Sequence, residues 1–461
     1  MATPRHFLLF PFMSKGHTIP LLNLARLLLR RNISVTIITT PLNSPFIRQT
    51  LTDTKATVID LSFPQNVPQI PNGIESTDKL PSMSLFVPFA TATKLMQPDF
   101  DQTLQSLLPR VTCMVSDGFL GWTQSTASRL GIPRLIFYGM NNYATTISTV
   151  IGRDRPHAKV DSYDELFTVP CFPSIQLTKN DLEYPFNDPY ATGPQAEFIL
   201  DLIETNMQSK GILVNSFYEL EAKFINYWNN EIGIGVKAWS VGPLCLAEPP
   251  KAQATEKPSW AQWLDECLTR GRSVMYVAFG SQAEITLEQL QEIANGLERS
   301  NVSFLWVARS MDFEVLDGFE ERVKDRGLIV RDWVDQVEIL RHECVNGFMS
   351  HCGWNSVIES ICESVPILAW PMMAEQHLNA KMVVEELGVG LRVLAINGSV
   401  RGFVSSECIE SMVKELMEGE KGKEVRKKVK ELGELARKAV VEGGSSWRTL
   451  DELLEEVYTM L

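Results

Sequence analysis

The sequence predicts an α/β protein with two parallel sheets, each covered by helices on both faces. Three observations lead to this class. Short apolar runs alternate with helical patterns along most of the chain, which is typical of helices that cover a parallel sheet. A segment without periodicity interrupts this alternation near the middle of the chain. Each half also opens in the same way, with a strand, a loop of small residues and a helix.

The length of the chain supports two domains. At 461 residues it exceeds what one hydrophobic core usually organises. The 44% of apolar residues are enough to build two cores.

The first half contains five predicted strands, each a short apolar run bounded by turn or loop residues: residues 7–10, 35–39, 113–116, 134–137 and 211–215. The first run resembles a short signal-peptide core, but it precedes Pro11 and leads into Ser-Lys-Gly-His instead of a small-residue cleavage site. We therefore expect a buried strand. No run of about 18 apolar residues occurs, so no membrane span is expected.

A loop at residues 14–17 follows the first strand, and the next helix is expected to start at Thr18 or Pro20. Ligands of open α/β sheets bind beyond the carboxyl ends of the strands. His17 lies at such an end and is a candidate functional residue. The alternative is that it only satisfies backbone groups in a tight turn.

The boundary between the halves is expected at Val-Gly-Pro-Leu, residues 241–244, and the aperiodic residues 247–258 that follow look like a linker. A second series of strands then begins: residues 273–279, 304–308, 328–331, 347–350 and 367–369. The two sheets would face each other across a cleft.

Charge and cysteine content exclude several classes of partner. A formal net charge of −13 opposes general attraction to nucleic acid or anionic lipid. The eight cysteines form no C-x-x-C pair, which argues against a disulfide scaffold and a structural zinc site. Reduced thiols in a cytosolic protein are the expectation.

Common catalytic motifs are absent. No G-x-G-x-x-G follows a strand, which makes an NAD or FAD enzyme unlikely, and no P-loop for a nucleoside triphosphate occurs. H-E-x-x-H and G-x-S-x-G are also missing, which removes the simplest metalloprotease and serine hydrolase hypotheses.

Residues 333–376 carry the strongest functional signal. After the apolar strand 347–350 comes a loop with His351 and Gly353, and a helix follows. Asn355 and Ser356 are good N-cap residues, so free amides and the positive helix end would point at a ligand. A phosphate fits there, because His351 can donate a hydrogen bond to it and Gly353 permits close backbone approach.

The same stretch contains groups that suit the rest of a nucleotide sugar. Glu359 could accept ribose hydroxyls, although an acid in the first turns of a helix can simply pair with the dipole. Trp333 could present a flat face to a base, although a core tryptophan is the common alternative. Glu375 and Gln376 end the stretch and would suit a group with hydroxyls.

This stretch closely resembles the signature box of the plant family 1 UDP-dependent glycosyltransferases. The matching residues are Trp333, Gln336, His351, Gly353, Trp354, Asn355, Ser356, Glu359, Glu375 and Gln376. The resemblance extends to residues 16–20, 115–117, 241–244, 278–281 and 443–446, so it covers essentially the whole chain.

The resemblance implies a GT-B fold, with two Rossmann-like doubly wound domains facing across a cleft. Residues 1–244 would form the acceptor-binding domain, 245–258 a linker and 259–440 the UDP-sugar-binding domain. Residues 441–461 would form a last helix that packs back on the first domain.

The resemblance also implies roles for the residues of the box. Trp333 would stack on uracil beside Val334, Gln336 and Glu359 would hold the ribose, and Ser281, His351, Asn355 and Ser356 would hold the diphosphate, with Gly353 in the same loop. Trp354, Glu375 and Gln376 would address the sugar. A final glutamine is usually associated with UDP-glucose, so glucose is the expected sugar.

By resemblance, His17 is the general base and Asp117 the acid that supports it. An imidazole, whose ordinary pKa is about 6.5, suits proton removal from a hydroxyl near neutrality. The expected reaction is a single inverting displacement that converts an α-linked UDP-sugar to a β-glycoside. No metal or cofactor is expected, because His351, Ser281 and helix amides would stabilise the leaving diphosphate.

Two departures and the acceptor stay open. Many relatives have Thr or Ser in the loop where this chain reads Phe-Tyr-Gly-Met-Asn-Asn, residues 137–142, which puts a sugar contact in doubt, and Asp335 replaces the usual Pro. The acceptor loops are expected within residues 63–89 and 140–186. Their aromatic residues, Phe86, Phe89, Tyr143, Phe167 and Tyr184, suit a flat apolar acceptor such as a flavonoid or another phenol, or serve ordinary packing. A non-catalytic nucleotide-sugar or small-molecule binding protein is the rival hypothesis.

Overall fold

The computed structural model describes residues 5–247, 257–280, 282–308 and 318–459. Ser281 and residues 248–256 of the predicted linker lie outside the described residues. The chain divides into two compact units. The first comprises Met1–Asn142, Tyr190–Pro249 and Ala439–Leu461, and the second Tyr143–Pro189 and Pro250–Lys438.

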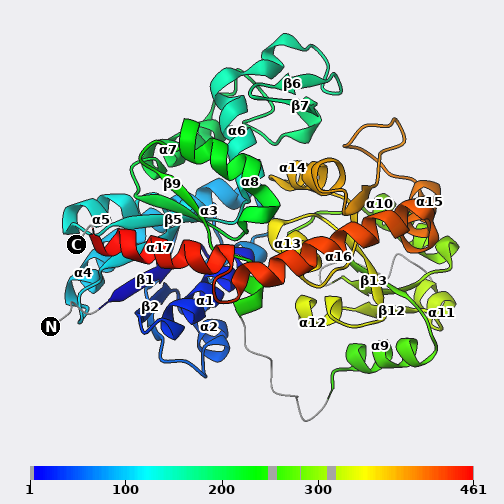
Figure 1. Cartoon of the computed structure of the whole chain (residues 1–461), viewed down its shortest axis with the longest axis horizontal. Coiled ribbons are helices and arrows are strands. Elements are labelled where there is room, and N and C mark those ends of the chain that lie inside the picture. The colour runs from blue at the N-terminus through cyan, green and yellow to red at the C-terminus, as the bar shows by residue number, and fades with distance from the viewer. Residues whose placement is uncertain (1–4, 248–256, 281, 309–317, 460–461) are drawn as a thin grey trace. The chain divides into compact units, whose positions relative to one another are not determined.

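The first unit contains a parallel sheet in the order β3-β2-β1-β4-β5-β8-β9 (Figure 1). The strands are β1 His6–Phe10, β2 Ser34–Thr39, β3 Thr57–Asp60, β4 Cys113–Asp117, β5 Arg134–Tyr138, β8 Gly211–Val214 and β9 Lys237–Ser240. The chain runs outward from β1 to β3 and then returns to place β4 on the other side of β1. The gap between β1 and β4 is therefore the topological switch point, where open sheets of this kind bind ligands.

Helices cover both faces of this sheet. They are α1 Lys15–Arg30, α2 Ser44–Thr50, α3 Phe86–Ala92, α4 Gln97–Ser106, α5 Thr123–Leu130, α7 Pro194–Asn206, α8 Tyr218–Tyr227 and α17 Ser445–Thr459. Side chains alternate along β1 because successive strand residues point to opposite faces. Phe7 and Leu9 share a core cluster with α1 and α17, whereas Leu8 and Phe10 pack with α3, α4 and α5.

The second unit has a parallel sheet in the order β12-β11-β10-β13-β14-β15. These strands are β10 Val274–Ala278, β11 Ser303–Val307, β12 Gly327–Val330, β13 Val345–Ser350, β14 Ile367–Ala369 and β15 Gly390–Arg392. Its switch point lies between β10 and β13. Alternate residues of β10 again pack in two core clusters, Met275 and Val277 in one and Val274 and Tyr276 in the other.

The helices of the second unit lie on both faces of its sheet and in the segment Tyr143–Pro189. They are α6 Asn142–Asp154, which starts at the unit boundary, α9 Ser259–Thr269, α10 Leu287–Ser300, α11 Phe319–Val323, α12 Gln336–Leu340, α13 Trp354–Cys362, α14 Gln376–Lys381, α15 Ser406–Glu418 and α16 Glu420–Val440, which ends in the first unit. The same segment contains an antiparallel pair, β6 Phe167–Val169 and β7 Phe172–Leu177.

The prediction of an α/β fold with two parallel sheets is confirmed, and all ten predicted strands are present near their predicted ends. The prediction missed three strands of the two parallel sheets, β3, β9 and β15. All three lie at sheet edges. An edge strand has only one neighbour and needs a weaker apolar pattern, as the partly exposed β3 illustrates.

The observed division differs from the predicted one in the middle of the first half. The prediction placed all of residues 1–244 in one domain, but Tyr143–Pro189 groups with the second unit. Buried contacts between Asp181 and Arg392 belong to this grouping. The predicted boundary treats each domain as one continuous stretch of sequence. A segment of the first half that packs with the second unit has no local sequence pattern that would reveal it. α17 packs on the sheet of the first unit, through Leu450, Leu453, Leu454 and Val457.

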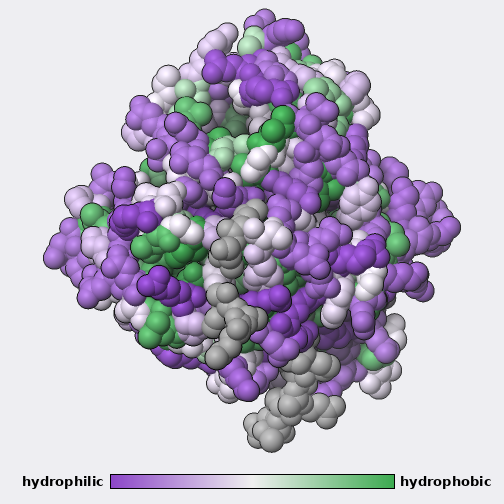
Figure 2. Space-filling view, turned by 60° about the vertical axis from the view of Figure 1, so that its left-hand side comes forward, coloured by the Kyte–Doolittle hydropathy of each residue, from purple (hydrophilic) through white to green (hydrophobic). Residues whose placement is uncertain are grey.

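The face in Figure 2 is mostly hydrophilic, and hydrophobic side chains gather there in a few separate patches. Among the described residues, no helix combines the length and the apolar character that crossing a bilayer requires.

Candidate functional site

His17 and Asp117 lie together at the switch point of the first sheet. Phe10 of β1 pairs with Ser116 of β4, so the residues that follow these strands are neighbours. His17 Nδ1 lies 2.6 Å from Asp117 Oδ2. The Asp117 side chain is buried, with 1% exposed, and that of His17 is 21% exposed. This contact argues against the alternative in which His17 only satisfies backbone groups.

The helix that carries His17 begins earlier than predicted. The prediction started the helix at Thr18 or Pro20, whereas α1 starts at Lys15 after the N-cap Ser14. His17 is therefore in the first turn of the helix and not in a loop. The prediction was wrong because Pro20 was taken as a start signal, whereas it is the sixth residue of α1 and lies inside the helix.

The carboxylate of Asp117 uses both of its oxygens. Oδ1 accepts the backbone N–H of Phe119 at 3.0 Å, while Oδ2 accepts from His17. A ring that donates from Nδ1 keeps Nε2 as an acceptor. Gly139 lies beside that edge of the ring, since a Cβ there would lie 3.2 Å from His17 Nε2. Glycine at position 139 therefore leaves room for the imidazole.

A buried arginine lies behind Asp117. Arg134 is 1% exposed and donates to Ser116 Oγ at 2.7 Å, to Ser209 Oγ at 2.7 Å and to Asn206 Oδ1 at 3.1 Å. Burial lowers its pKa to about 10, while the charges of Tyr138 and Asp117 oppose that shift, so the guanidinium stays charged at neutral pH. Arg134 was not among the predicted site residues, because two of its partners, Asn206 and Ser209, lie 72 and 75 residues away in the sequence.

Aromatic rings surround His17. The ring centroid of Phe119 lies 5.6 Å from that of His17, and Phe12 lies at 6.0 Å. Phe86 contacts both of these phenylalanines. Of the five aromatic residues predicted for the acceptor, Phe86 and Tyr184 are half-buried, whereas Phe89, Tyr143 and Phe167 are buried in the protein interior. For these three the packing alternative describes the side chain.

The predicted phosphate loop follows β13 in the second unit. Burial lowers the pKa of His351 to about 4, so its imidazole is neutral at pH 7. Its Nδ1 is buried and has no hydrogen-bond partner among the described residues. Two glycines make room for the ring, because a Cβ at Gly280 or Gly353 would lie 2.9 or 2.6 Å from Nε2. The end of β10 and the end of β13 thus meet at this imidazole.

Helix α13 starts before the predicted N-cap residues. The prediction gave Asn355 and Ser356 the cap position, but the N-cap is Gly353, and these two residues lie in the first turn with Trp354. Their backbone N–H groups still belong to the positive helix end, which suits an anion. The ring of Trp354 is buried, with 2% exposed.

Three predicted residues form one hydrogen-bonded group. Gln336 Nε2 donates to Glu359 Oε2 at 2.7 Å and to Ser356 Oγ at 3.0 Å. Asp335, which replaces the usual proline, is the N-cap of α12 and accepts from the N–H of Glu338. This cap explains how the position tolerates the exchange.

Trp333 is 52% exposed, so the alternative of a core tryptophan is wrong. The side chain of the adjacent Val334 packs in a core cluster of the second unit.

The last two residues of the box lie at the start of α14. Glu375 is the N-cap, and Gln376 Oε1 accepts the N–H groups of Met372 and Met373, each at 3.0 Å. The sequence analysis missed Asn379, which is fully buried and donates to Cys352 O at 2.9 Å. Asn379 therefore ties α14 to the loop that carries His351.

No group of three or more side chains suited to a metal ion occurs among the described residues, and all eight cysteines are free thiols. The predicted site therefore consists of two sets of residues, one in each unit, together with Ser281, which lies outside the described residues.

Known proteins resemble the chain over its whole length. Residues 254–436 match the family described as UDP-glucoronosyl and UDP-glucosyl transferase. UDP-glycosyltransferase 90A1 of Arabidopsis thaliana is 54% identical over 98% of this chain and 96% of its own length. UDP-glucose flavonoid 3-O-glucosyltransferase 7 of Fragaria ananassa is 36% identical over 98% of this chain and 96% of its own length.

A solved structure also matches almost the whole chain. The crystal structure of Glycyrrhiza uralensis UGT73P12 complexed with glycyrrhetinic acid 3-O-monoglucuronide has a TM-score of 0.89 and 31% identity. The match covers 99% of this chain and 96% of the other. The two parallel sheets are the Rossmann-like domains of the GT-B fold, and the chain belongs to the plant family 1 UDP-dependent glycosyltransferases.

Proposed function

We propose that this UDP-glycosyltransferase transfers glucose from UDP-glucose to a hydroxyl of a small apolar acceptor and inverts the anomeric centre to give a β-O-glycoside. The observation that carries this proposal is the 2.6 Å contact between His17 and the buried Asp117. A binding protein needs no such pair, whereas sugar transfer to a hydroxyl needs a base with an oriented ring that removes the hydroxyl proton.

His17 is the general base in this proposal. An acceptor hydroxyl at Nε2 gives its proton to the ring while its oxygen bonds to the anomeric carbon of the sugar. The bond from that carbon to the UDP oxygen breaks in the same step, on the opposite face. Asp117 then faces an imidazolium, which its negative charge stabilises.

Neutral hydrogen-bond donors stabilise the negative charge of the leaving diphosphate. His351 has an unpartnered buried nitrogen and is neutral, so it offers a hydrogen bond to a phosphate oxygen. The first turn of α13 adds backbone N–H groups, which stabilise negative charge without a metal ion. Ser281 is proposed to bind the same group.

The uridine end has supporting contacts in the second unit. Glu359 and Gln336 hydrogen-bond to each other, and ribose hydroxyls would replace that contact. The exposed ring of Trp333 offers a stacking face to uracil. We propose that Glu375 and Gln376 contact the sugar, with Trp354 at the adjacent helix start.

The acceptor is proposed to be a flat phenolic compound such as a flavonoid. The half-buried Phe119 lies next to His17, and the half-buried Phe86 contacts Phe119 in turn, so both can stack on an aromatic ring. The name of the Fragaria relative, a flavonoid glucosyltransferase, supports this class. A cytosolic location stays a prediction.

The test is incubation of the protein with UDP-glucose and a panel of phenols, alcohols, acids, amines and thiols. Mass spectrometry follows hexose addition, and a coupled assay follows UDP release. We expect a β-O-glucoside of at least one phenol. Transfer from other UDP-sugars but not from UDP-glucose would contradict the donor proposal, and an α-glycoside product would contradict inversion.

A further inference from the structure

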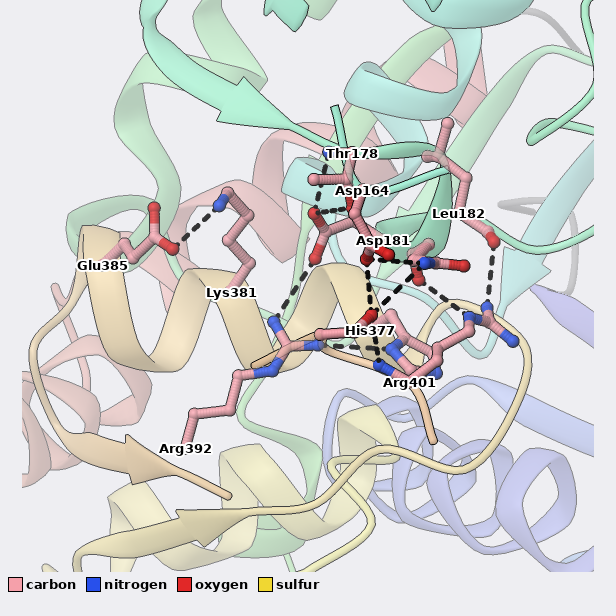
Figure 3. Close-up of polar contacts among 11 residues, drawn as sticks. Asp164, Thr178, Asp181, Leu182, His377, Lys381, Glu385, Arg392 and Arg401 are labelled. Carbon is pink, nitrogen blue, oxygen red and sulfur yellow. Dashed lines mark hydrogen bonds and ion pairs between the residues drawn. The ribbon is translucent and has the colours of Figure 1, made fainter. Parts of the chain in front are cut away.

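A buried polar cluster in the second unit joins residues 160–183 to helix α14. We call Asp181, His377 and Arg392 the Asp181 cluster (Figure 3). Arg392 Nη1 lies 3.3 Å from Asp181 Oδ1, and Arg392 Nη2 lies 3.2 Å from His377 Nδ1. Asp181 and His377 are both 2% exposed. One guanidinium thus connects a residue near β7 with a residue of α14.

Hydrogen bonds at Asp181 and at His377 both fix the geometry of the cluster. Asp181 Oδ2 accepts the N–H of Thr178 at 2.9 Å and its hydroxyl at 3.0 Å, so the carboxylate cannot turn freely. A guanidinium can only donate, so His377 Nδ1 must be the acceptor of the hydrogen bond from Arg392. This requires a neutral imidazole ring. Burial and the nearby charges of Arg401 and Arg392 lower the pKa of His377 to about 2, so this link holds at neutral pH.

Further contacts fasten the same segment to the second unit. Arg401 donates to the carbonyls of Asn180 and Leu182, at 2.8 and 2.9 Å. Ser399 Oγ donates to Asp164 Oδ1 at 2.5 Å. The segment that contains Asp181 is therefore anchored at several points beside α14 (Figure 3).

Helix α14 begins at Gln376, directly after Glu375. On one side Asn379 binds the carbonyl of Cys352, in the loop that carries His351. On the other side His377 accepts a hydrogen bond from Arg392, which also contacts Asp181. Two independent sets of contacts thus hold the helix whose first residues are proposed to contact the sugar.

We propose that Asp181, Arg392 and His377 are positioning residues for the sugar end of the donor site, because they hold α14 and with it Glu375 and Gln376. A segment from the first half of the sequence then determines how the sugar is held, while UDP is held by other helices. This inference rests on the proposed function. Stability alone is a weak explanation, since apolar residues often replace a buried ion pair without loss.

The test variant is Arg392→Lys. Lysine keeps the charge, but one ammonium cannot reproduce the planar fork that reaches both Asp181 and His377. Calorimetry measures the Kd of UDP and of UDP-glucose. We expect unchanged UDP affinity and UDP-glucose affinity weakened by about fivefold or more, the factor for one hydrogen bond. The ratio of the Kd values for UDP-galactose and UDP-glucose should also become smaller than in the wild type.

The matched control is Glu385→Gln. It removes the 2.8 Å ion pair between Lys381, the last residue of α14, and Glu385 in the following π-helical segment Met382–Glu386, and leaves the Asp181 cluster intact. We expect the ratio of the two affinities to stay at the wild-type value. A double variant, Asp181→Leu with Arg392→Met, replaces the ion pair by apolar residues and serves if Arg392→Lys fails to fold.

Equal weakening of UDP and UDP-glucose in the folded variants, or no change in either, would overturn the positioning role. The positioning role would also be overturned if the wild-type protein bound UDP and UDP-glucose with the same affinity. Failure of the wild type to bind either nucleotide is a distinct result, which overturns the proposed function and this inference together.

Discussion

Asp117 holds His17 in one orientation, and that orientation decides which ring nitrogen meets an acceptor. Nδ1 is engaged by the carboxylate, so Nε2 is the nitrogen that can take a proton. Arg134 holds the strand end behind Asp117 through Ser116 and Asn206. The orientation of the proposed base therefore depends on a short series of contacts within the first unit.

The first prediction concerns the base. His17→Ala should retain UDP binding, because the proposed UDP contacts lie in the second unit. Turnover should fall by roughly 100-fold or more, the scale of general-base catalysis. Initial rates with a phenol that is not ionised at the assay pH check this, together with UDP affinity by calorimetry. Near-normal turnover would reject the base assignment.

The second prediction concerns the counterion of the base. Asp117→Asn keeps the size of the side chain but removes the charge that stabilises imidazolium. We expect turnover to fall by about 10-fold or more, with unchanged UDP affinity. The kcat for the same phenol measures the effect. Wild-type kinetics in this variant would make Asp117 a structural residue.

At the scale of elements, both sheets place their polar groups at the same topological position. In the first unit the site lies between β1 and β4, and in the second between β10 and β13. In the second unit a residue that follows β10 leaves room for a polar side chain that follows β13. Gly280 and His351 are such a pair.

The third prediction tests the start of α13. In Gly353→Ala the new Cβ would lie 2.6 Å from His351 Nε2, so the imidazole must move. Because the ring then loses its place at the phosphate, we expect UDP affinity to fall by about 10-fold or more. Calorimetric titration with UDP measures this loss.

The control for this exchange is Gly152→Ala in α6. A Cβ at Gly152 would meet only Phe186, at 3.7 Å, which is ordinary van der Waals contact. UDP affinity should stay at the wild-type value. If the Gly353→Ala protein binds UDP as well as the control does, His351 is not a phosphate contact.

At the scale of the whole molecule, buried neutral histidines link stability to pH. Burial lowers the pKa of His157 to about 4 and that of His377 to about 2, from the ordinary histidine value of 6.5. Below pH 6.5 the unfolded chain binds protons that the folded chain does not, so stability falls as the pH decreases. Above this pH both states are neutral and these residues add no dependence.

The fourth prediction follows from this linkage. Between pH 6.5 and about 4, each of the two histidines should lower the free energy of unfolding by up to about 1.4 kcal/mol per pH unit. Urea unfolding followed by tryptophan fluorescence at several pH values measures the slope. In His157→Gln the slope of the unfolding free energy against pH should decrease by the contribution of one histidine. An unchanged slope would show that His157 is already protonated in the folded protein.

The fifth prediction concerns metal ions. Because neutral hydrogen-bond donors and a helix end are proposed to stabilise the leaving diphosphate, the protein should remain active in EDTA. The assay compares UDP release with EDTA and with added magnesium. Loss of activity in EDTA that magnesium restores would contradict the proposed mechanism.

Only some of the candidate site residues could be named from local patterns. His17 and His351 follow recognisable strands, whereas Gln336 was named through the family resemblance alone. Arg134, Asn379 and the Asp181 cluster were missed. These residues act through partners that are far away in the sequence, such as Asp181 and Arg392, which are 211 residues apart.

The sequence by itself determined the α/β class, ten of the strands and the strand ends near which the candidate site residues lie, since apolar periodicity and small-residue loops are local patterns. Tertiary structure alone decided the strand order that joins His17 to Asp117 across 100 residues, and the grouping of Tyr143–Pro189 with the second unit. Strand pairing and buried ion pairs depend on packing between distant segments, for which no stretch of sequence carries a signal of its own.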